Sequence, residues 1–549
     1  MTIMENKLQS KVEKRSKADR LYLILKGAIV TLGFAVLMLL VLTTLLRREF
    51  IAAYSEWPYV HKNSFRFILC ALVTIVIIVM GRKVLKKVDP RRAFLVFAGA
   101  FLIAGLFLVI NMPTKLNEAD QLFTLKAANQ MNHGNFISLQ LDKFHPSVLP
   151  FEKNLGGYLA IYPFQLGYVT YLRLLECFTT NIRFFYLLNV LIFLLINYLL
   201  YRIVKLVTQN NGLVMNWTLL LSFAFLPELF FVLFIYGNIP GLCACLAAVY
   251  FGLKLIMDDS HGSFTWLWCV LLFVLAYQLK SNYQIAVLAL GIVFVLHAIK
   301  HRRYKLIAMP LITFALMLGS NKLVTAAYEA ESGLHLSKGL PMITYVAMGL
   351  EPQNDRGRGA GWYDGYTLNV YLANHFDSKK TTQAAKAKIK DELKYYSNNP
   401  HEASQFFKDK FVSTWSDPTF ESVWIAPYFA RPRTVILNNI YYGNRYSIKH
   451  PKIVKWYQKS MKPISAWCNI VVVTILVLAA GFVLYKKTKL NPYATFAILY
   501  LMGGMAFHLM WETKSQYVFQ YIVCLIPVAA MLLGEFDNSE SNNVAKKEK

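Results

Sequence analysis

Two carboxylates near position 120 are the residues best suited to chemistry in this sequence. Glu118 and Asp120 lie a few residues after the apolar stretch 94–112, which is long enough to span a membrane. The two carboxylates are therefore expected close to a membrane surface. A carboxylate at such a surface can act as a general base toward a substrate that a lipid carries. The side of the membrane that it faces decides this hypothesis, so the topology of the chain comes first.

A second group of polar residues lies in short turns between long apolar stretches. Charged groups in such turns are costly unless they are paired or line a hydrated cavity. A lysine there can hold a phosphate as a compact point charge. The alternative is that the residues are interfacial, with side chains that reach water or pair with one another. The group consists of Lys280, Asn282, Glu512 and Lys514.

The composition predicts an all-α polytopic membrane protein. Of the 549 residues, 56% are hydrophobic and only 16% are charged, and the mean hydropathy is +0.39. Several apolar stretches reach the roughly 20 residues that a membrane-spanning helix needs, and none alternates as a transmembrane strand would. We expect about 12–13 transmembrane helices.

The positive charge points to a lipid bilayer and not to nucleic acid. The net charge is +27, but most lysines and arginines lie in loops beside apolar stretches. The positive-inside rule places such loops in the cytoplasm. We therefore expect no nucleic-acid partner.

The same rule orients both ends of the chain. The basic N-terminus precedes spans at about 21–46 and 65–80, and the loop 81–92 contains six lysines and arginines. The span at about 93–112 then exits outward, which puts Asp120 on the outer face. Counting back from the basic tail through spans at 466–485, 492–511 and 517–534 agrees with this orientation.

The middle of the chain contains one apolar stretch too many. Six stretches lie between the outer loop at 113 and the basic loop at 300, where an odd number must cross. The stretch 158–175 is rich in aromatic residues and is interrupted by Pro163, so we expect it to lie at the interface or to re-enter. The short pair within 213–256 is the alternative.

These spans divide the chain into five parts. Residues 1–92 form an N-terminal extension with two transmembrane helices. Residues 93–321 form the transmembrane core, with an outer acidic loop at 113–160. Residues 322–465 form an external domain, mainly helical and either α or α+β, which carries 20 Lys+Arg and 12 Asp+Glu and so suits an anionic partner. Residues 466–534 are the last spans, and 535–549 are a cytoplasmic tail.

The external domain contains a Gly-rich loop at 355–366 that is not a dinucleotide fingerprint, because no strand-turn-helix unit surrounds it. Arg356 and Arg358 could hold a phosphate, and Trp362 and Tyr363 could stack on a sugar. An ordinary flexible loop is the alternative. The seven cysteines lie mostly in apolar stretches, and their spacing is not that of a metal site.

Five short motifs carry a resemblance to a known family. They resemble the glycosyltransferase C superfamily, in the branch of the protein O-mannosyltransferases and the lipid A aminoarabinose transferase. In detail the chain looks like the family 39-like membrane glycosyltransferases of Gram-positive bacteria, over about 93–534. Two spans precede the acidic loop's span, whereas the family core begins with that span. The motifs are PTKLNEADQ at 113–121, YPFQLG at 162–167, LKSN at 279–282, GWYDGY at 361–366 and WETKSQY at 511–517.

The resemblance implies a hexosyltransferase of the bacterial plasma membrane, with an extracytoplasmic active site. The donor would be a sugar on polyprenyl phosphate, and the acceptor a cell-wall or surface glycan, a lipid or a protein. Asp120 would be the base of an inverting transfer, with Glu118 as a helper or alternate. Lys280 would hold the lipid phosphate together with Arg356 or Arg358. Further substrate contacts are expected from Tyr162, Gln165, Asn282, Trp362, Tyr363, Glu512 and Lys514.

The resemblance also implies no cofactor. The oligosaccharyltransferase branch uses a divalent metal, but no second set of acidic ligands is evident here, so we expect a metal-independent reaction. Two other functions stay open: a flippase or transporter of lipid-linked sugars, and a non-catalytic partner in polymer assembly. Against a transporter, the two halves show no internal repeat. Asp120→Asn separates these functions, since only an enzyme requires that carboxylate.

Overall fold

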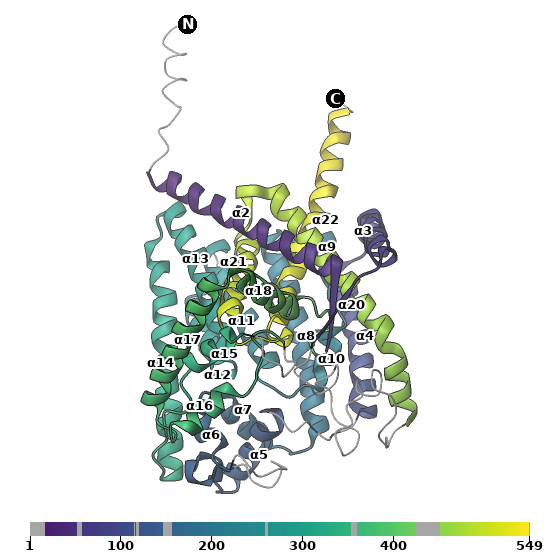
Figure 1. Cartoon of the computed structure of the whole chain (residues 1–549). Coiled ribbons are helices and arrows are strands. Elements are labelled where there is room, and N and C mark those ends of the chain that lie inside the picture. The colour runs from purple at the N-terminus through teal and green to yellow at the C-terminus, as the bar shows by residue number, and fades with distance from the viewer. Residues whose placement is uncertain are drawn as a thin grey trace.

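The computed structural model describes residues 17–51, 58–112, 114, 116, 120–145, 156–258, 262–352, 359–423 and 451–547. Over these residues the chain is almost entirely helical, and its strands are the antiparallel pair β1 (Arg47–Ile51) and β2 (Pro58–Lys62). The start of α2 (Lys17–Leu46) and the end of α22 (Phe519–Lys547) lie at one end of the helical bundle, and α5 (Asp120–Asn132) and α6 (Tyr158–Ile161) lie at the other (Figure 1). The prediction of an all-α polytopic membrane protein is confirmed.

Ten described helices are long and apolar enough to cross a membrane. The candidate spans contain 19–29 residues. At 1.5 Å per residue, each is about 28 Å long or more. They include α2 (Lys17–Leu46), α3 (Phe65–Leu85), α4 (Pro90–Asn111), α8 (Ile182–Val207), α11 (Asn238–Met257), α13 (Gln284–His301), α14 (Ala308–Ser332), α20 (Pro451–Lys486), α21 (Pro492–Met510) and α22 (Phe519–Lys547).

The expected count of 12–13 spans is reached only if shorter and bent helices are included. Helix α9 (Gly212–Ala224) and the segment Pro227–Leu233 pass as a span together but bend by 56° at the break between them. Helix α12 (Thr265–Leu279) is apolar but has 15 residues. The stretch 158–175 breaks into α6, a 3-10 turn and the 11-residue α7 (Leu166–Glu176). Helix α7 is roughly 16 Å long, too short to cross the bilayer by itself.

Capping residues set where several of these helices begin. The Asp89 carboxylate accepts hydrogen bonds from the backbone N–H groups of Arg91, at 2.7 Å, and Arg92, at 3.1 Å, and Pro90 occupies the first turn of α4. These contacts satisfy N–H groups that have no partner within the helix. Helix α4 therefore begins directly at the basic loop. Its other end, at Asn111, precedes Asp120 by nine residues in the sequence.

The N-terminal extension is part of the bundle. Helix α2 packs against α20, α21 and α13, and Gly33 lies so close to α21 that a Cβ there would be 2.2 Å from Ile498. The buried Lys26 amine donates a hydrogen bond to Thr495 in the first turn of α21. Helix α3 contacts α20, α9 and α22 but is mostly exposed, as a helix facing lipid would be.

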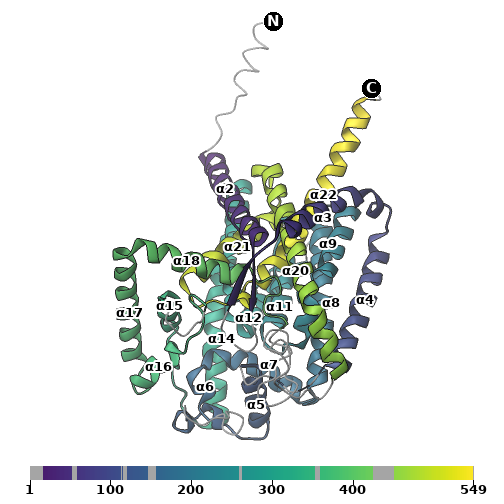
Figure 2. The same ribbon diagram turned by 45° about the vertical axis from the view of Figure 1, so that its right-hand side comes forward.

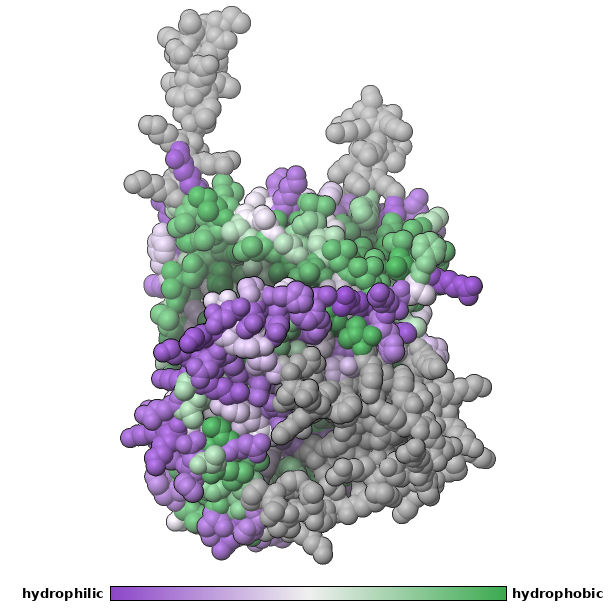
Figure 3. Space-filling model, in the orientation of Figure 1, coloured by the Kyte–Doolittle hydropathy of each residue, from purple (hydrophilic) through white to green (hydrophobic). Residues whose placement is uncertain are grey.

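Four described helices between α14 and α20 belong to the region expected to lie outside the membrane. Figure 2 shows α17 standing beside the bundle, with α18 running back toward it. On the face drawn in Figure 3, hydrophobic side chains form a band near the end with the termini, and hydrophilic ones lie below it. Helices α14 and α20 extend past the expected boundaries at 322 and 465. The four helices are α15 (Ile343–Leu350), α16 (Tyr366–Ala373), α17 (Ser378–Asn398) and α18 (Pro400–Trp415).

The remaining elements are short connectors. The four-residue α10 (Pro227–Phe230) follows the break after α9, and 3-10 turns join other helices. All seven cysteines are free, and only Cys70, within α3, and Cys177, at the end of α7, are exposed. The 3-10 turns are η1 (Ile137–Leu139), η2 (Leu141–Lys143), η4 (Pro163–Gln165), η5 (Phe231–Leu233), η6 (Ser281–Tyr283), η7 (Tyr304–Ile307), η8 (Lys487–Lys489) and η9 (Ser515–Tyr517).

Candidate functional site

Asp120 is the first residue of α5, and two tyrosines hold its carboxylate. One oxygen accepts a hydrogen bond from the Tyr158 hydroxyl at 2.8 Å, and the other from the Tyr236 hydroxyl at 3.2 Å. Burial raises the pKa of both tyrosines well above the usual value, so their hydroxyls stay protonated and donate. The Asp120 side chain itself remains exposed. It is therefore a fixed carboxylate that a ligand can reach.

Lys280 lies where α12 ends and η6 begins, and its amine faces two aromatic rings. The Nζ atom is 4.3 Å from the centre of the Tyr236 ring and 5.5 Å from that of Tyr517. Both distances are within the range of cation–π attraction. Tyr236 thus touches both Asp120 and Lys280, so one aromatic side chain joins the carboxylate to the ammonium group.

The charges around Lys280 identify its neighbours. Burial lowers the pKa of Lys280 to about 8, the carboxylates of Asp120 and Glu512 act against this, and Lys514 adds to it. Glu512 and Lys514 belong to the turn after α21, almost 400 residues from Asp120 in sequence. The fold therefore brings together charged residues that the sequence analysis selected from three separate turns.

Tyr162 and Tyr363 extend this cluster toward the external helices. Their hydroxyls are hydrogen-bonded to one another, and burial raises the pKa of both. The Lys514 amine lies 5.9 Å from the centre of the Tyr363 ring. The Gly-rich loop therefore does reach the site, through Tyr363. We call Asp120, Tyr158, Tyr236, Lys280, Glu512 and Lys514 the Asp120 cluster.

The other predicted residues have different positions. Gln165 is buried and donates to the Tyr158 hydroxyl at 2.8 Å, so it supports that tyrosine from behind. Trp362 is 2% exposed and donates from Nε1 to the Ser413 hydroxyl at 3.0 Å, so it lies beneath the loop surface. Asn282 is half-buried in η6, two residues from Lys280. Glu118, Arg356 and Arg358 lie outside the described residues.

The sequence analysis did not select three tyrosines of the site. Tyr158 is four residues before Tyr162, and that spacing puts both on one face of a helix. Tyr236 stands in the Gly/Pro-containing break before α11, and Tyr517 ends the WETKSQY motif. The helix breaks were the available signal, because side chains at breaks between spans can converge on one polar site.

A group of buried carboxylates lies close to the same turn. Glu49 of β1 is 0% exposed, and neither of its carboxylate oxygens has a hydrogen-bond partner among the residues that the structure describes. Burial and the nearby carboxylates of Asp417 and Glu421 raise the pKa of Glu49 well above its usual value. Ser515 donates to Asp417 at 2.9 Å and lies 3.1 Å from Glu421. A neutral, protonated Glu49 is the form that suits this environment.

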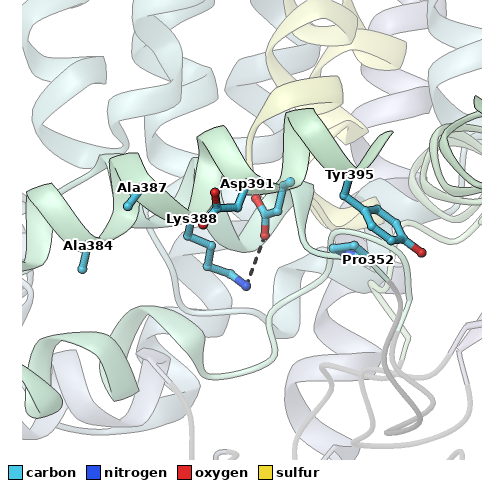
Figure 4. Close-up of a pocket in the computed structure, with 7 residues that line it drawn as sticks. Pro352, Ala384, Ala387, Lys388, Asp391 and Tyr395 are labelled. Atoms are coloured by element: carbon cyan, nitrogen blue, oxygen red, sulfur yellow. Dashed lines mark ion pairs between the residues drawn. The ribbon is translucent and has the colours of Figure 1, made fainter. Parts of the chain in front are cut away.

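An open groove of about 590 Å³ runs along α17, apart from the Asp120 cluster (Figure 4). Lys388 at its centre pairs with Glu392 at 3.2 Å and with Glu351 at 3.3 Å, and its amine lies 4.9 Å from the Tyr366 ring centre. Lys388 is thus paired within the external region, and Asp391 adds a further carboxylate to the groove lining. Its apolar lining consists of Pro352, Ala384 and Ala387.

Comparisons with known proteins add no assignment. No protein-family model matches the sequence, and no curated protein matches it either. Within the described part of the chain, no group of three or more His, Cys, Asp or Glu side chains is arranged to hold a metal ion. The geometry of the Asp120 cluster is therefore the basis for any functional proposal.

Proposed function

We propose that this chain is a membrane glycosyltransferase that moves a sugar from a polyprenyl-phosphate donor to an acceptor hydroxyl on the outer face of the membrane. One observation carries the proposal. An exposed carboxylate, Asp120, is held by two tyrosine hydroxyls and joined through Tyr236 to Lys280. A general base and an anion-binding cation within one cluster suit transfer from a phosphate leaving group.

In this proposal Asp120 takes the proton of the acceptor hydroxyl. The acceptor oxygen attacks the anomeric carbon, and the bond between that carbon and the phosphate oxygen breaks. The polyprenyl phosphate leaves with the bonding electron pair, and its negative charge is stabilised by Lys280. The proton on Asp120 then passes to water, which regenerates the base. Attack opposite the leaving group inverts the anomeric configuration.

Tyr158 and Tyr236 keep the carboxylate in place in this mechanism, because each donates a hydrogen bond to one of its oxygens. The donor lipid would approach from the bilayer, and its head group would meet Lys280, Glu512 and Lys514. The acceptor is expected to be a surface glycan, a lipid or a protein in a bacterial plasma membrane. An anionic acceptor is favoured by the basic balance of residues 322–465.

Sugar transfer by purified protein tests the proposal. Wild type, Asp120→Asn and Asp142→Asn would be reconstituted in nanodiscs and given radiolabelled polyprenyl-phosphate sugars. Asp142 is a matched control, because its carboxylate is exposed at the surface beside Lys143. We expect turnover by wild type and Asp142→Asn, and a loss of about 10²–10⁴-fold in Asp120→Asn.

Two results would contradict the proposal. Equal turnover by Asp120→Asn and wild type would remove Asp120 from the role of base. No turnover with any donor, together with donor movement between the leaflets of vesicles, would favour a flippase of lipid-linked sugars. Thermal midpoints of the three proteins would show whether all are folded.

A further inference from the structure

Helix α18 presents a row of buried polar side chains to the loops that carry the site. Lys410, Ser413 and Thr414 follow the spacing i, i+3, i+4, which places them along one helical face, and Asp417 lies two residues beyond the last residue of the helix. Their exposed fractions are between 0 and 3%. Polar groups at this depth need partners. We call these four residues the α18 stripe.

Lys410 binds two loop segments at once. Its amine donates to the carbonyl oxygens of Gly349, at the end of α15, and of Trp511, at 2.8 Å. Both segments pack closely here, since a Cβ on Gly349 would lie 2.4 Å from the Trp511 carbonyl carbon. The lysine therefore acts as a link between the external helices and the end of α21.

The rest of the stripe contacts the same loops. Ser413 accepts from Trp362 at 3.0 Å, and the hydroxyl oxygens of Thr414 and Thr513 are 3.1 Å apart. Asp417 accepts from Ser515 at 2.9 Å. Each contact joins α18 either to the Gly-rich loop or to the turn after α21.

These two loops carry residues of the candidate site. The Gly-rich loop supplies Tyr363, directly after Trp362. The turn after α21 supplies Glu512 and Lys514, on either side of Thr513. The loops also bind each other, because the Thr513 N–H donates to the Gly361 carbonyl at 3.0 Å.

Gly361 shows how tightly Lys410 fits between the loops. Its φ of +71° is a conformation that favours glycine, and a Cβ there would lie 2.6 Å from Lys410 Cε. The lysine stem thus fills the space under the loop, while its amine holds the neighbouring carbonyls. A side chain of another length would leave either the space or the carbonyls unfilled.

We propose that Lys410 is a positioning residue for the candidate site: its amine holds the carbonyls of Gly349 and Trp511 and its stem packs under Gly361, and together these contacts set the Gly-rich loop and the turn after α21 relative to Asp120 and Lys280. Lys410 itself touches neither Asp120 nor Lys280 in any described contact, and its charge interacts with that of Glu512. Its effect on the reaction acts through the placement of these loops, and small errors in geometry cost about 10²-fold in rate. The proposal rests on the proposed transferase function only for its turnover readout.

Hydrogen exchange of the wild-type chain and two lysine variants tests the positioning itself. Lys410→Met removes the two carbonyl contacts and keeps most of the stem. Lys408→Met changes an exposed lysine of the same helix and is the control. We expect exchange of the Glu512 and Thr513 amides, which donate to Tyr345 and Gly361, to become at least about tenfold faster in Lys410→Met alone. Equal exchange in all three proteins would overturn the proposal.

Turnover then separates positioning from general stability. We expect Lys410→Met to lower kcat by about tenfold or more and to change the donor KM by less than about threefold, at equal amounts of folded protein. A loss that follows only the folded fraction would overturn the proposal. If Lys410→Met does not fold, Thr414→Val gives the same comparison, with a smaller change at Thr513. If wild type shows no turnover, the proposed function fails, while the exchange result still decides the positioning.

Discussion

The Asp120 cluster and the α18 stripe contain similar charged groups but differ in access to water. Asp120 is exposed and Lys280 is half-buried, whereas Lys410 is 0% and Asp417 is 2% exposed. Lys280 faces aromatic rings, which leave its ammonium protons available to a ligand. The Lys410 amine donates hydrogen bonds to two backbone carbonyls. In our proposals, accessible charge serves ligand binding in the first region, and buried charge serves loop placement in the second.

The turn after α21 takes part in both regions, with different side chains in each. Glu512 and Lys514 face Lys280, while Thr513 and Ser515 face α18. Adjacent side chains in an extended segment point to opposite sides. A single turn can therefore present charges to a ligand on one side and be anchored to the protein on the other.

Loss of Lys280 would have the largest effect among changes that test the comparison. Lys280→Met should lower donor kcat/KM by about 10²-fold, because an anion-binding cation is removed from a site of low dielectric. Lys390→Met, an exposed lysine of α17, is the control. Unchanged kcat/KM in Lys280→Met would place the donor phosphate elsewhere.

The pH dependence of donor use provides a second measurement on Lys280. With a pKa of about 8, the amine loses its charge as the pH rises through that value. Donor kcat/KM of the wild type should therefore fall above pH 8. Lys280→Arg keeps its charge and should give a flat profile there, even if its maximum is lower. Parallel profiles for the two proteins would contradict the assignment.

Removing one tyrosine hydroxyl should have an intermediate effect. Tyr158→Phe deletes the 2.8 Å hydrogen bond to Asp120 and also leaves Gln165 without that partner. A hydrogen bond to a charged group contributes about 1.5–3 kcal/mol, so we expect turnover to fall by roughly tenfold to 10²-fold. Tyr304→Phe, at an exposed tyrosine, should change nothing. Equal turnover in both variants would mean that Asp120 does not need Tyr158.

The smallest effect is expected on stability, at the buried carboxylate of Glu49. Because the pKa of Glu49 is raised, the folded state holds a proton that the unfolded state releases near pH 4.5, so stability falls as the pH rises above that value. Glu49→Gln does not titrate. Its thermal midpoint in detergent should exceed that of wild type by about 2–4 °C at pH 8, and the two should converge near pH 5.

The control for Glu49 is Asp391→Asn, an exposed carboxylate of α17. It should leave the midpoint unchanged at both pH values. A difference between Glu49→Gln and wild type that is the same at pH 5 and pH 8 would show that Glu49 is not a buried, proton-holding carboxylate.

The sequence predicts the helical membrane architecture because span-length apolar runs have few other solutions. It also selects Asp120, Lys280, Glu512 and Lys514, since charges in short turns between spans stand out. It does not predict the partners of these residues. Tyr158, Tyr236 and Lys410 reach their contacts across long separations in the chain, and tyrosines and lysines are common in loops of this sequence. Which of them are buried depends on how the helices pack.

The span count is likewise predictable only in part from the sequence, because hydropathy is local and helix packing is not. Hydropathy finds the stretch 213–233, but the 56° bend at its centre depends on the residues around Pro227 and on packing. The resemblance to the glycosyltransferase C superfamily rests on the five short motifs and stays a prediction.

The uneven exposure of the cysteines allows one native thiol, that of Cys177, to be labelled selectively. Cys177 ends α7 beside the C-terminal end of α5, and five of the other six cysteines are buried or half-buried. Cys70 is exposed only within the apolar span α3, where hydrocarbon would shield it from a charged reagent. A membrane-impermeant maleimide therefore has one accessible target, so the orientation of the Asp120 end of the molecule can be read in intact cells without introducing a single mutation.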